Sequence, residues 1–118
     1  MALKKLDPSL YKNKVEHPKE TVYEIITAEN GLGWGLAIAD IEESELHVHK
    51  KVKEIYVVLE GALEITLDGH RGRFKPGTCI EIFSGVKHKA RSLRKERARV
   101  GVFSIPPWIS KDHFILKT

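Results

Sequence analysis

The sequence predicts an all-β protein that forms a sandwich or a barrel. Short apolar runs rich in β-branched residues recur along the chain, and turn residues such as Gly, Pro, Asp and Ser separate them. Pro8 and Pro18 interrupt the polar start of the chain, which argues against a long helix there. These observations favour many short strands over helices.

The elements are expected in the following order. Residues 1–18 form an irregular or edge segment, and the β-branched run that follows forms the first strand, before a turn at residues 29–33. Later strands end at glycine-containing turns, of which Asp68-Gly69 and Pro76-Gly77 are examples. The predicted strands cover residues 21–27, 34–41, 45–49, 54–60, 62–67, 78–82, 87–93 and 98–105, and residues 106–118 form a tail.

Composition indicates one globular domain spanning residues 1–118. The apolar runs are too short to cross a bilayer, and the start of the chain lacks the apolar core of a signal peptide, so the cytoplasm is the expected location. Cys79 is the only cysteine and cannot form a disulfide within the chain. We expect it to be a small core side chain rather than a nucleophile.

Four residues carry side chains suited to one metal ion. His47 and His49 lie two apart on a predicted strand and therefore point to the same face. Glu54 opens the next strand, so a hairpin would bring its carboxylate beside the two imidazoles, and His88 must come from another hairpin. Three imidazoles and one carboxylate suit Mn, Fe, Co, Ni, Cu or Zn rather than Ca or Mg. The sequence thus predicts a single divalent transition-metal site.

The spacing of these residues resembles the first motif of the cupin family, G-x5-H-x-H-x3,4-E-x6-G. The positions that match are His47, His49, Glu54 and Gly61, while Ile41 replaces the leading glycine. The second cupin motif, G-x5-P-x-G-x2-H-x3-N, is matched by Gly77, Gly85 and His88, while Phe83 replaces the proline and Ser92 the asparagine. The short segment between the motifs is similar to that of small single-domain microbial cupins.

This resemblance implies a double-stranded β-helix, or jelly roll, with the metal inside its open end. It also implies a homodimer, for which the N-terminal segment 1–20 is the candidate edge strand. Without the motif proline, the loop before His88 could be held by burial of the Phe83 ring, while Gly85 can still adopt a positive φ.

Alternation along the strands sorts the neighbours of the metal ligands. Tyr56 shares the face of Glu54, so these two are the candidate catalytic residues, although Tyr56 could equally be a packing residue. Ala90 and Ser92 share the inward face of His88. We expect Ala90 to leave room beside the metal and Ser92 to present its hydroxyl to the cavity.

The chain carries 20 Lys and Arg against 16 Asp and Glu, a formal net charge of +4. Seven of these cations lie between Lys87 and Arg99, where only Glu96 opposes them. They alternate with apolar or small residues and no aromatic residues interleave, which indicates a solvated strand face rather than a nucleic-acid interface. The basic balance remains compatible with an anionic small-molecule substrate.

The remaining histidines, His17, His70 and His113, lie outside both motifs and are expected at the surface. The aromatic residues Trp34, Phe103 and Trp108 form either a pocket wall or core and dimer contacts.

Coordination geometry suggests the activity. Four protein ligands on an octahedral ion leave two adjacent positions for water, dioxygen or a chelating substrate. The first hypothesis is a metal-dependent isomerase or lyase acting on a sugar or an oxo acid, with Glu54, Tyr56 or a metal-bound hydroxide as the base. The alternatives are an Fe(II)-dependent dioxygenase and a non-enzymatic module that binds or senses a small molecule.

Overall fold

The structure is a computed structural model, and it describes residues 13–117. Regular structure in this part of the chain is almost entirely β, with two 3-10 turns, η2 (Ala28–Asn30) and η3 (Ser110–Asp112). The strands are β1 (Lys14–His17), β2 (Glu20–Ile26), β3 (Gly35–Ile41), β4 (His47–Val48), β5 (Lys53–Glu60), β6 (Leu63–Leu67), β7 (His70–Phe74), β8 (Cys79–Ile82), β9 (His88–Ser92), β10 (Ala98–Ile105) and β11 (Phe114–Ile115).

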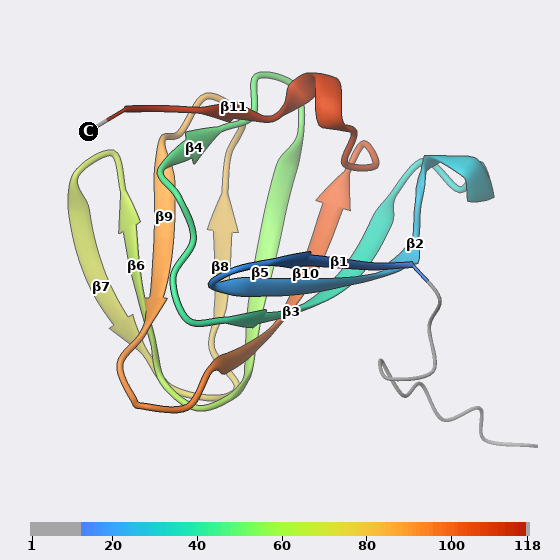
Figure 1. The fold of residues 1–118 in the computed structure, drawn as a ribbon. Coiled ribbons are helices and arrows are strands. Elements are labelled where there is room, and N and C mark those ends of the chain that lie inside the picture. Colours follow the sequence, from blue (N-terminus) through green and yellow to red (C-terminus); the bar gives the residue numbers. More distant parts are fainter. Residues whose placement is uncertain (1–12, 118) are drawn as a thin grey trace, which may run out of the picture.

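The strands form two antiparallel sheets (Figure 1). One sheet has the order β1-β2-β3-β10-β5-β8 and the other the order β11-β4-β9-β6-β7. Consecutive strands such as β4 and β5 therefore fall in different sheets, which is the arrangement of a jelly roll. The predicted fold class is confirmed. Figure 1 shows β4, β11 and η3 at the same end of the barrel.

The hydrophobic core lies between the two sheets. Alternation along the strands fills it: Ile80 and Ile82 of β8 are buried, whereas Cys79 and Glu81 are exposed. Val58 of β5 is fully buried and belongs to the same cluster. The prediction that Cys79 is a core residue is therefore wrong, because its position in the strand directs it to the outer face.

Three strands differ from those expected. Polar residues dominate β7, which pairs only with β6 at the edge of its sheet, and so it lacks the apolar alternation that would reveal it. At one edge of the six-stranded sheet, β1 occupies part of the segment expected to be irregular or an edge, while residues 1–12 lie outside the described residues. The strand expected at 45–49 is reduced to the two residues of β4.

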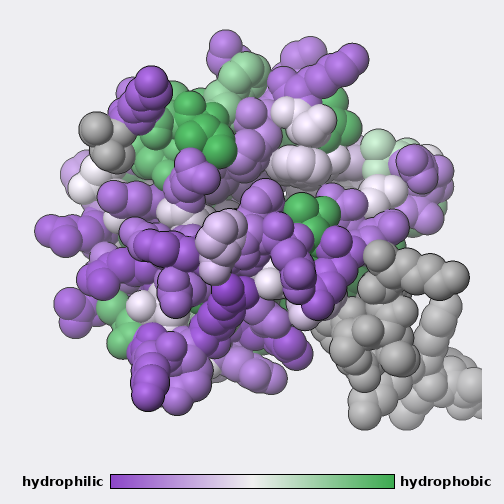
Figure 2. Space-filling view, in the orientation of Figure 1, coloured by the Kyte–Doolittle hydropathy of each residue, from purple (hydrophilic) through white to green (hydrophobic). Residues whose placement is uncertain are grey.

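The face seen in Figure 2 is mainly hydrophilic, with small hydrophobic patches between charged side chains. Among residues 13–117, no helix has the length and apolar character needed to span a membrane.

Candidate metal centre

The fold brings together the four residues predicted as metal ligands. His47 lies directly opposite His88 in the register of β4 and β9, and His49 follows β4 on the same face. Glu54 reaches them from β5 in the facing sheet. All four side chains are buried, and one ligand atom of each lies within 4.8 Å of the others.

Backbone carbonyl groups orient all three imidazoles. The Nδ1 atom of His47 lies 2.7 Å from the carbonyl oxygen of Glu45, and that of His88 lies 2.9 Å from the carbonyl oxygen of Val86. For His49 the corresponding distance, to the carbonyl oxygen of Asp112, is 2.8 Å. Because a carbonyl oxygen can only accept, each Nδ1 carries a proton, so in the neutral form of each ring Nε2 is the nitrogen whose lone pair is free for a metal. This is how protein structures commonly prepare histidines for metal binding.

The Nε2 atoms converge on the carboxylate of Glu54. Those of His49 and His88 both lie 3.1 Å from Glu54 Oε1. The contact from His49 has no hydrogen-bond geometry, so its buried Nε2 has no hydrogen-bond partner among the described residues. Two ligands about 2.1 Å from an ion and at right angles are about 3 Å apart. A transition metal at the centre of this group would therefore fit the spacing and satisfy the orphaned Nε2.

The electrostatics of the group favour a cation. Burial alone would raise the pKa of Glu54, but the close contacts and charge interaction with His49 and His88 lower it to about 2. Burial, together with the neighbouring His88, lowers the pKa of His47 to about 3. The site therefore holds an ionised carboxylate beside a neutral imidazole at neutral pH, and these are the protonation states that metal binding requires.

The C-terminal segment secures the loop that carries two of the ligands. The Asp112 carboxylate accepts hydrogen bonds from the backbone N–H groups of Lys50, Lys51 and Val52, at 2.9 to 3.2 Å. These bonds lower the pKa of Asp112 against the opposing effect of burial. Because the carbonyl of the same residue accepts from His49, Asp112 fixes both the loop between His49 and Glu54 and the orientation of one ligand.

His113, expected at the surface, lies in the site instead. Its ring stacks on His47 with centroids 4.7 Å apart, and it lies 5.2 Å from the ring of His49. Its Nδ1 is buried without a hydrogen-bond partner among the described residues. It does not belong to the group of four possible ligands. No sequence signal predicted this position, because β11 folds back onto β4 by pairing residues 66 and 68 positions apart in the chain.

A cavity of about 780 Å³ opens beside the four-residue group. His47, His49 and Glu54 contribute to its wall, and so do His113 and Trp108 from the C-terminal segment. A volume of this size is typical of sites for small molecules. The arrangement can present a bound molecule to a metal ion at the buried end of the cavity.

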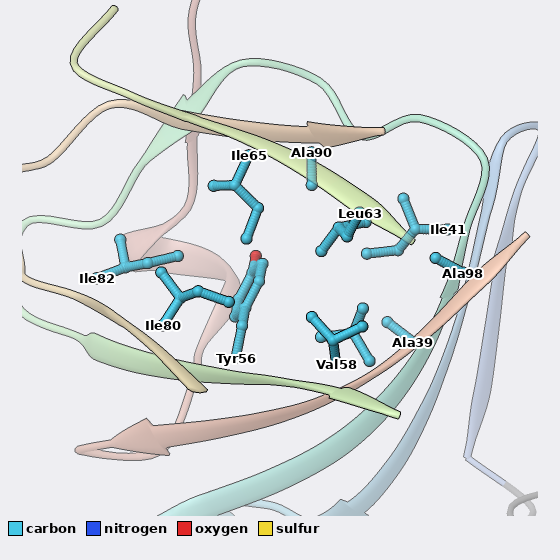
Figure 3. Packing of buried hydrophobic residues seen from close by; sticks show 11 residues of the cluster. Ala39, Ile41, Tyr56, Val58, Leu63, Ile65, Ile80, Ile82, Ala90 and Ala98 are labelled. Carbon is cyan, nitrogen blue, oxygen red and sulfur yellow. The ribbon is translucent and has the colours of Figure 1, made fainter. Parts of the chain in front are cut away.

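Tyr56 contributes to the same wall and also packs in the hydrophobic core. Figure 3 shows its ring beside the side chain of Ile80, with its hydroxyl end towards Ile65. Burial, and then the charge of Glu54, raise the pKa of Tyr56 well above its usual value, so its hydroxyl stays protonated.

Three expectations about the surroundings of the metal are wrong. Ser92 does not line the cavity, since its hydroxyl donates to the carbonyls of Arg94 and Glu96 in the next loop. Ala90 packs in the filled core. Phe83 is 57% exposed and lies under the ammonium group of Lys53, so burial of its ring does not hold the His88 loop.

The predicted aromatic residues separate into two groups. Trp34 stacks on Phe103 with ring centroids 4.9 Å apart, and neither residue lines the cavity. Trp108 does line it, in edge contact with His113 at 5.7 Å. Gly85 adopts φ +85° in the turn before His88, as its place in the motif predicts, and its N–H donates to the carbonyl of His49 at 2.6 Å.

Known proteins share this fold and parts of this sequence. A crystal structure of a protein from Planctomyces limnophilus is similar with a TM-score of 0.81 and 21% identity, covering 97% of each chain. Quercetin 2,3-dioxygenase of Bacillus subtilis is 34% identical over 79 residues, which are 67% of this chain but 21% of that protein. An uncharacterized protein of Methanocaldococcus jannaschii is 33% identical over 72 residues, which are 61% of this chain and 58% of that protein.

The chain therefore spans only part of the length of both sequence relatives. The family model of the cupin domain matches residues 37–106, which include all four possible metal ligands and both sequence motifs. The two antiparallel sheets and the convergent histidines agree with that match. The chain belongs to the cupin domain family.

Proposed function

We propose that this protein is a metal-dependent enzyme acting on a small molecule, with His47, His49, Glu54 and His88 as the ligands of one Mn, Fe, Co, Ni, Cu or Zn ion. The observation that carries the proposal is the convergence of three carbonyl-oriented imidazoles on a buried carboxylate, with the Nε2 of His49 left unsatisfied. A structural role alone does not account for that arrangement, because an orphaned buried nitrogen costs free energy.

The cavity supports a site that is open to a substrate rather than a closed structural site. Three of the four residues face it, so an ion held there would keep positions open to a bound molecule. Such an ion would supply a Lewis acid for an oxygen atom of the substrate and, if redox active, a centre for dioxygen chemistry. The chain itself supplies an ionised carboxylate at Glu54 and a protonated hydroxyl at Tyr56, which we assign as the candidate catalytic residues.

Among the possible reactions we favour oxidation by dioxygen, with Fe(II) as the natural ion for it. The cavity wall combines many apolar side chains with Trp108, which suits an apolar substrate better than a sugar or an oxo acid. The similarity to quercetin 2,3-dioxygenase, the relative that shares 34% identity, also supports oxidation by dioxygen.

An isomerase or lyase is the second candidate. Glu54 and Tyr56 lie two residues apart on β5 and both contribute to the cavity wall, so a base and a proton donor are close together. A hydroxycarbonyl substrate that chelates the ion would use the same open positions. This reaction would proceed without consuming oxygen, which separates the two candidates.

The test reconstitutes the protein separately with iron, manganese, nickel and zinc and measures oxygen uptake over a panel of hydroxylated aromatic and hydroxycarbonyl compounds. We expect iron-dependent uptake that disappears in His49→Ala and persists in His70→Ala, which changes an exposed histidine of β7. Product formation without uptake would favour the isomerase or lyase. Metal-loaded protein that is stabilised by compounds without converting them would point to the non-enzymatic binding module.

A further inference from the structure

We infer that the cavity takes a largely apolar molecule that is uncharged or cationic, and that it disfavours anions although the chain as a whole is basic. This inference names the substrate class and rests on the proposed function only in taking the cavity beside the metal ligands as the substrate site. It replaces the anionic substrate that the net charge of +4 made plausible.

The size and the wall of the cavity set the apolar character. Its volume of about 780 Å³ holds a molecule with fused or linked rings and is far larger than a three-carbon acid needs. Apolar side chains from both ends of the chain line it: Val15, Val22, Ile26, Leu36, Ala37, Ala39, Val102, Trp108 and Ile115. Removing such a wall and an apolar ligand from water together is the main favourable contribution to binding.

The charges in the wall set the preference for cations. Five acidic residues are among the lining residues of the cavity, of which Glu54 belongs to the four-residue group: Glu20, Glu24, Glu43, Glu45 and Glu54. Lys19 is the only lysine or arginine among the lining residues, and its ammonium lies 3.2 Å from the carboxylate of Glu43. Away from an ion held by the four-residue group, an anion in the cavity would therefore meet Glu20, Glu24 and Glu45 with no unpaired lysine or arginine among the lining residues to offset them.

The basic residues that raise the net charge lie elsewhere. The Arg91 guanidinium pairs with Glu64 at 2.9 Å, and that of Arg99 pairs with Asp40 at 2.8 Å. Neither arginine lines the cavity, and Lys89 is exposed on the outer face of β9. Net charge and local charge thus have opposite signs here, and a bound substrate responds mainly to the local one because salt screens distant charges.

The histidine end and the rest of the cavity favour different groups. An ion held by the four-residue group at the buried end would bind an oxygen atom of the substrate. Glu24 lies only half-buried in the wall and Glu45 is exposed, so a cationic group can reach their carboxylates while it keeps some water. The expected ligand carries its oxygen atoms at one end and any positive charge at the other.

The test compares three probes of similar shape that differ in charge: naphthalenemethanol, naphthylmethyl-trimethylammonium and naphthalenesulfonate. Isothermal titration calorimetry on the zinc-loaded full chain measures each dissociation constant. We expect the neutral and cationic probes to bind at least about tenfold more tightly than the sulfonate. Equal binding of the three, tighter binding of the sulfonate, or binding of none would overturn the inference.

Variants locate the source of the preference. The double variant Glu24→Gln with Glu45→Gln should weaken the cationic probe about three- to tenfold and leave the neutral probe unchanged. Glu42→Gln is the matched control, since Glu42 is exposed and outside the wall, and should change neither. If the double variant binds the cationic probe as tightly as the wild type does, the wall carboxylates are not the cause of the preference, and the inference is wrong.

Failure of the proposed function and failure of the charge preference give different experimental results. Repeating the titrations on His49→Ala removes a proposed metal ligand, and with it the ion, but leaves the acidic residues of the wall in place. If the charge preference persists there while no metal-dependent turnover is found in the wild type, the proposed function fails and the inference stands. If turnover is found and the sulfonate binds most tightly, the inference alone fails.

Discussion

At the scale of single residues, the site depends on which nitrogen of each imidazole is free. Three backbone carbonyls accept from Nδ1, and this leaves three Nε2 atoms for an ion. The sequence spacing predicts the ligand residues. The carbonyl partners of His47 and His88 are two residues away in the chain, whereas that of His49 comes from Asp112 in the distant η3 turn.

We expect His49→Ala and His88→Ala each to reduce bound metal from near one equivalent to below about a tenth, because three ligands cannot hold the ion as four do. Elemental analysis by mass spectrometry after reconstitution and desalting measures the content. His70→Ala should keep the wild-type content, since His70 is exposed on β7. Full metal content in both ligand variants would rule out this site.

His113→Phe should retain close to one equivalent of metal. A phenyl ring keeps the stacking on His47, and His113 does not belong to the four-residue group. The same elemental analysis, beside His47→Phe as a control that should lose the ion, checks this. Loss of metal in His113→Phe would make it a fifth ligand.

Glu20→Gln should raise the thermal unfolding midpoint at pH 7. Burial, partly offset by His17, raises the pKa of Glu20 above its ordinary value of 4.5. The unfolded chain then releases this proton at lower pH than the folded protein, so ionisation favours unfolding as pH rises above 4.5.

The amide has no such ionisation, and the gain should vanish below pH 4.5, where both states keep the proton. Differential scanning calorimetry of the metal-free proteins from pH 4 to 8 measures the difference, with Glu42→Gln as the exposed control. A constant difference across this range would contradict the stated cause.

At the scale of elements, the short η3 turn holds the loop between His49 and Glu54 in place. It brings the Asp112 carboxylate onto the N–H groups of residues 50–52 and so closes the loop between two ligands. The backbone N–H groups of this loop have no partners in regular secondary structure, and the carboxylate of Asp112 accepts their hydrogen bonds instead.

Asp112→Ala should destabilise the protein by about 1 to 3 kcal/mol, because three backbone N–H groups lose their acceptor. Asp112→Asn keeps one side-chain oxygen and should lose less, and both should bind metal more weakly through the loosened loop. Urea unfolding and competition with a metal chelator measure the two effects. Unchanged stability in both variants would mean that the loop holds its conformation without Asp112.

At the scale of the whole molecule, the open edges of the two sheets determine how copies can associate. β1 lies at the edge of the six-stranded sheet, and its residues are exposed. Such an edge pairs readily with another strand. We therefore expect a homodimer through β1, as the resemblance to small cupins implied.

Light scattering with size-exclusion chromatography should give a dimer for the wild type and a shift towards monomer for Val15→Lys, since lysine at an edge opposes strand pairing. Arg71→Glu on β7, at the edge of the other sheet, should stay dimeric. A monomeric wild type would exclude the dimer.

Much of this architecture could be predicted from the sequence. Strand alternation and turn residues indicated most of the strands, and the spacing of His47, His49, Glu54 and His88 indicated a common site. Both features are local or repeat at fixed intervals, so they are visible without three-dimensional information. The edge strand β7 was missed because an exposed edge does not require apolar alternation.

The sequence by itself determined the fold class and the four possible metal ligands, because side-chain alternation and motif spacing are properties of the chain. Only the tertiary structure decided the roles of Asp112 and His113, the acidic and apolar wall of the cavity, and the exposed position of the Cys79 side chain. The physical reason is that these features depend on which distant strands pair and in which register, and such pairings lie between residues many positions apart.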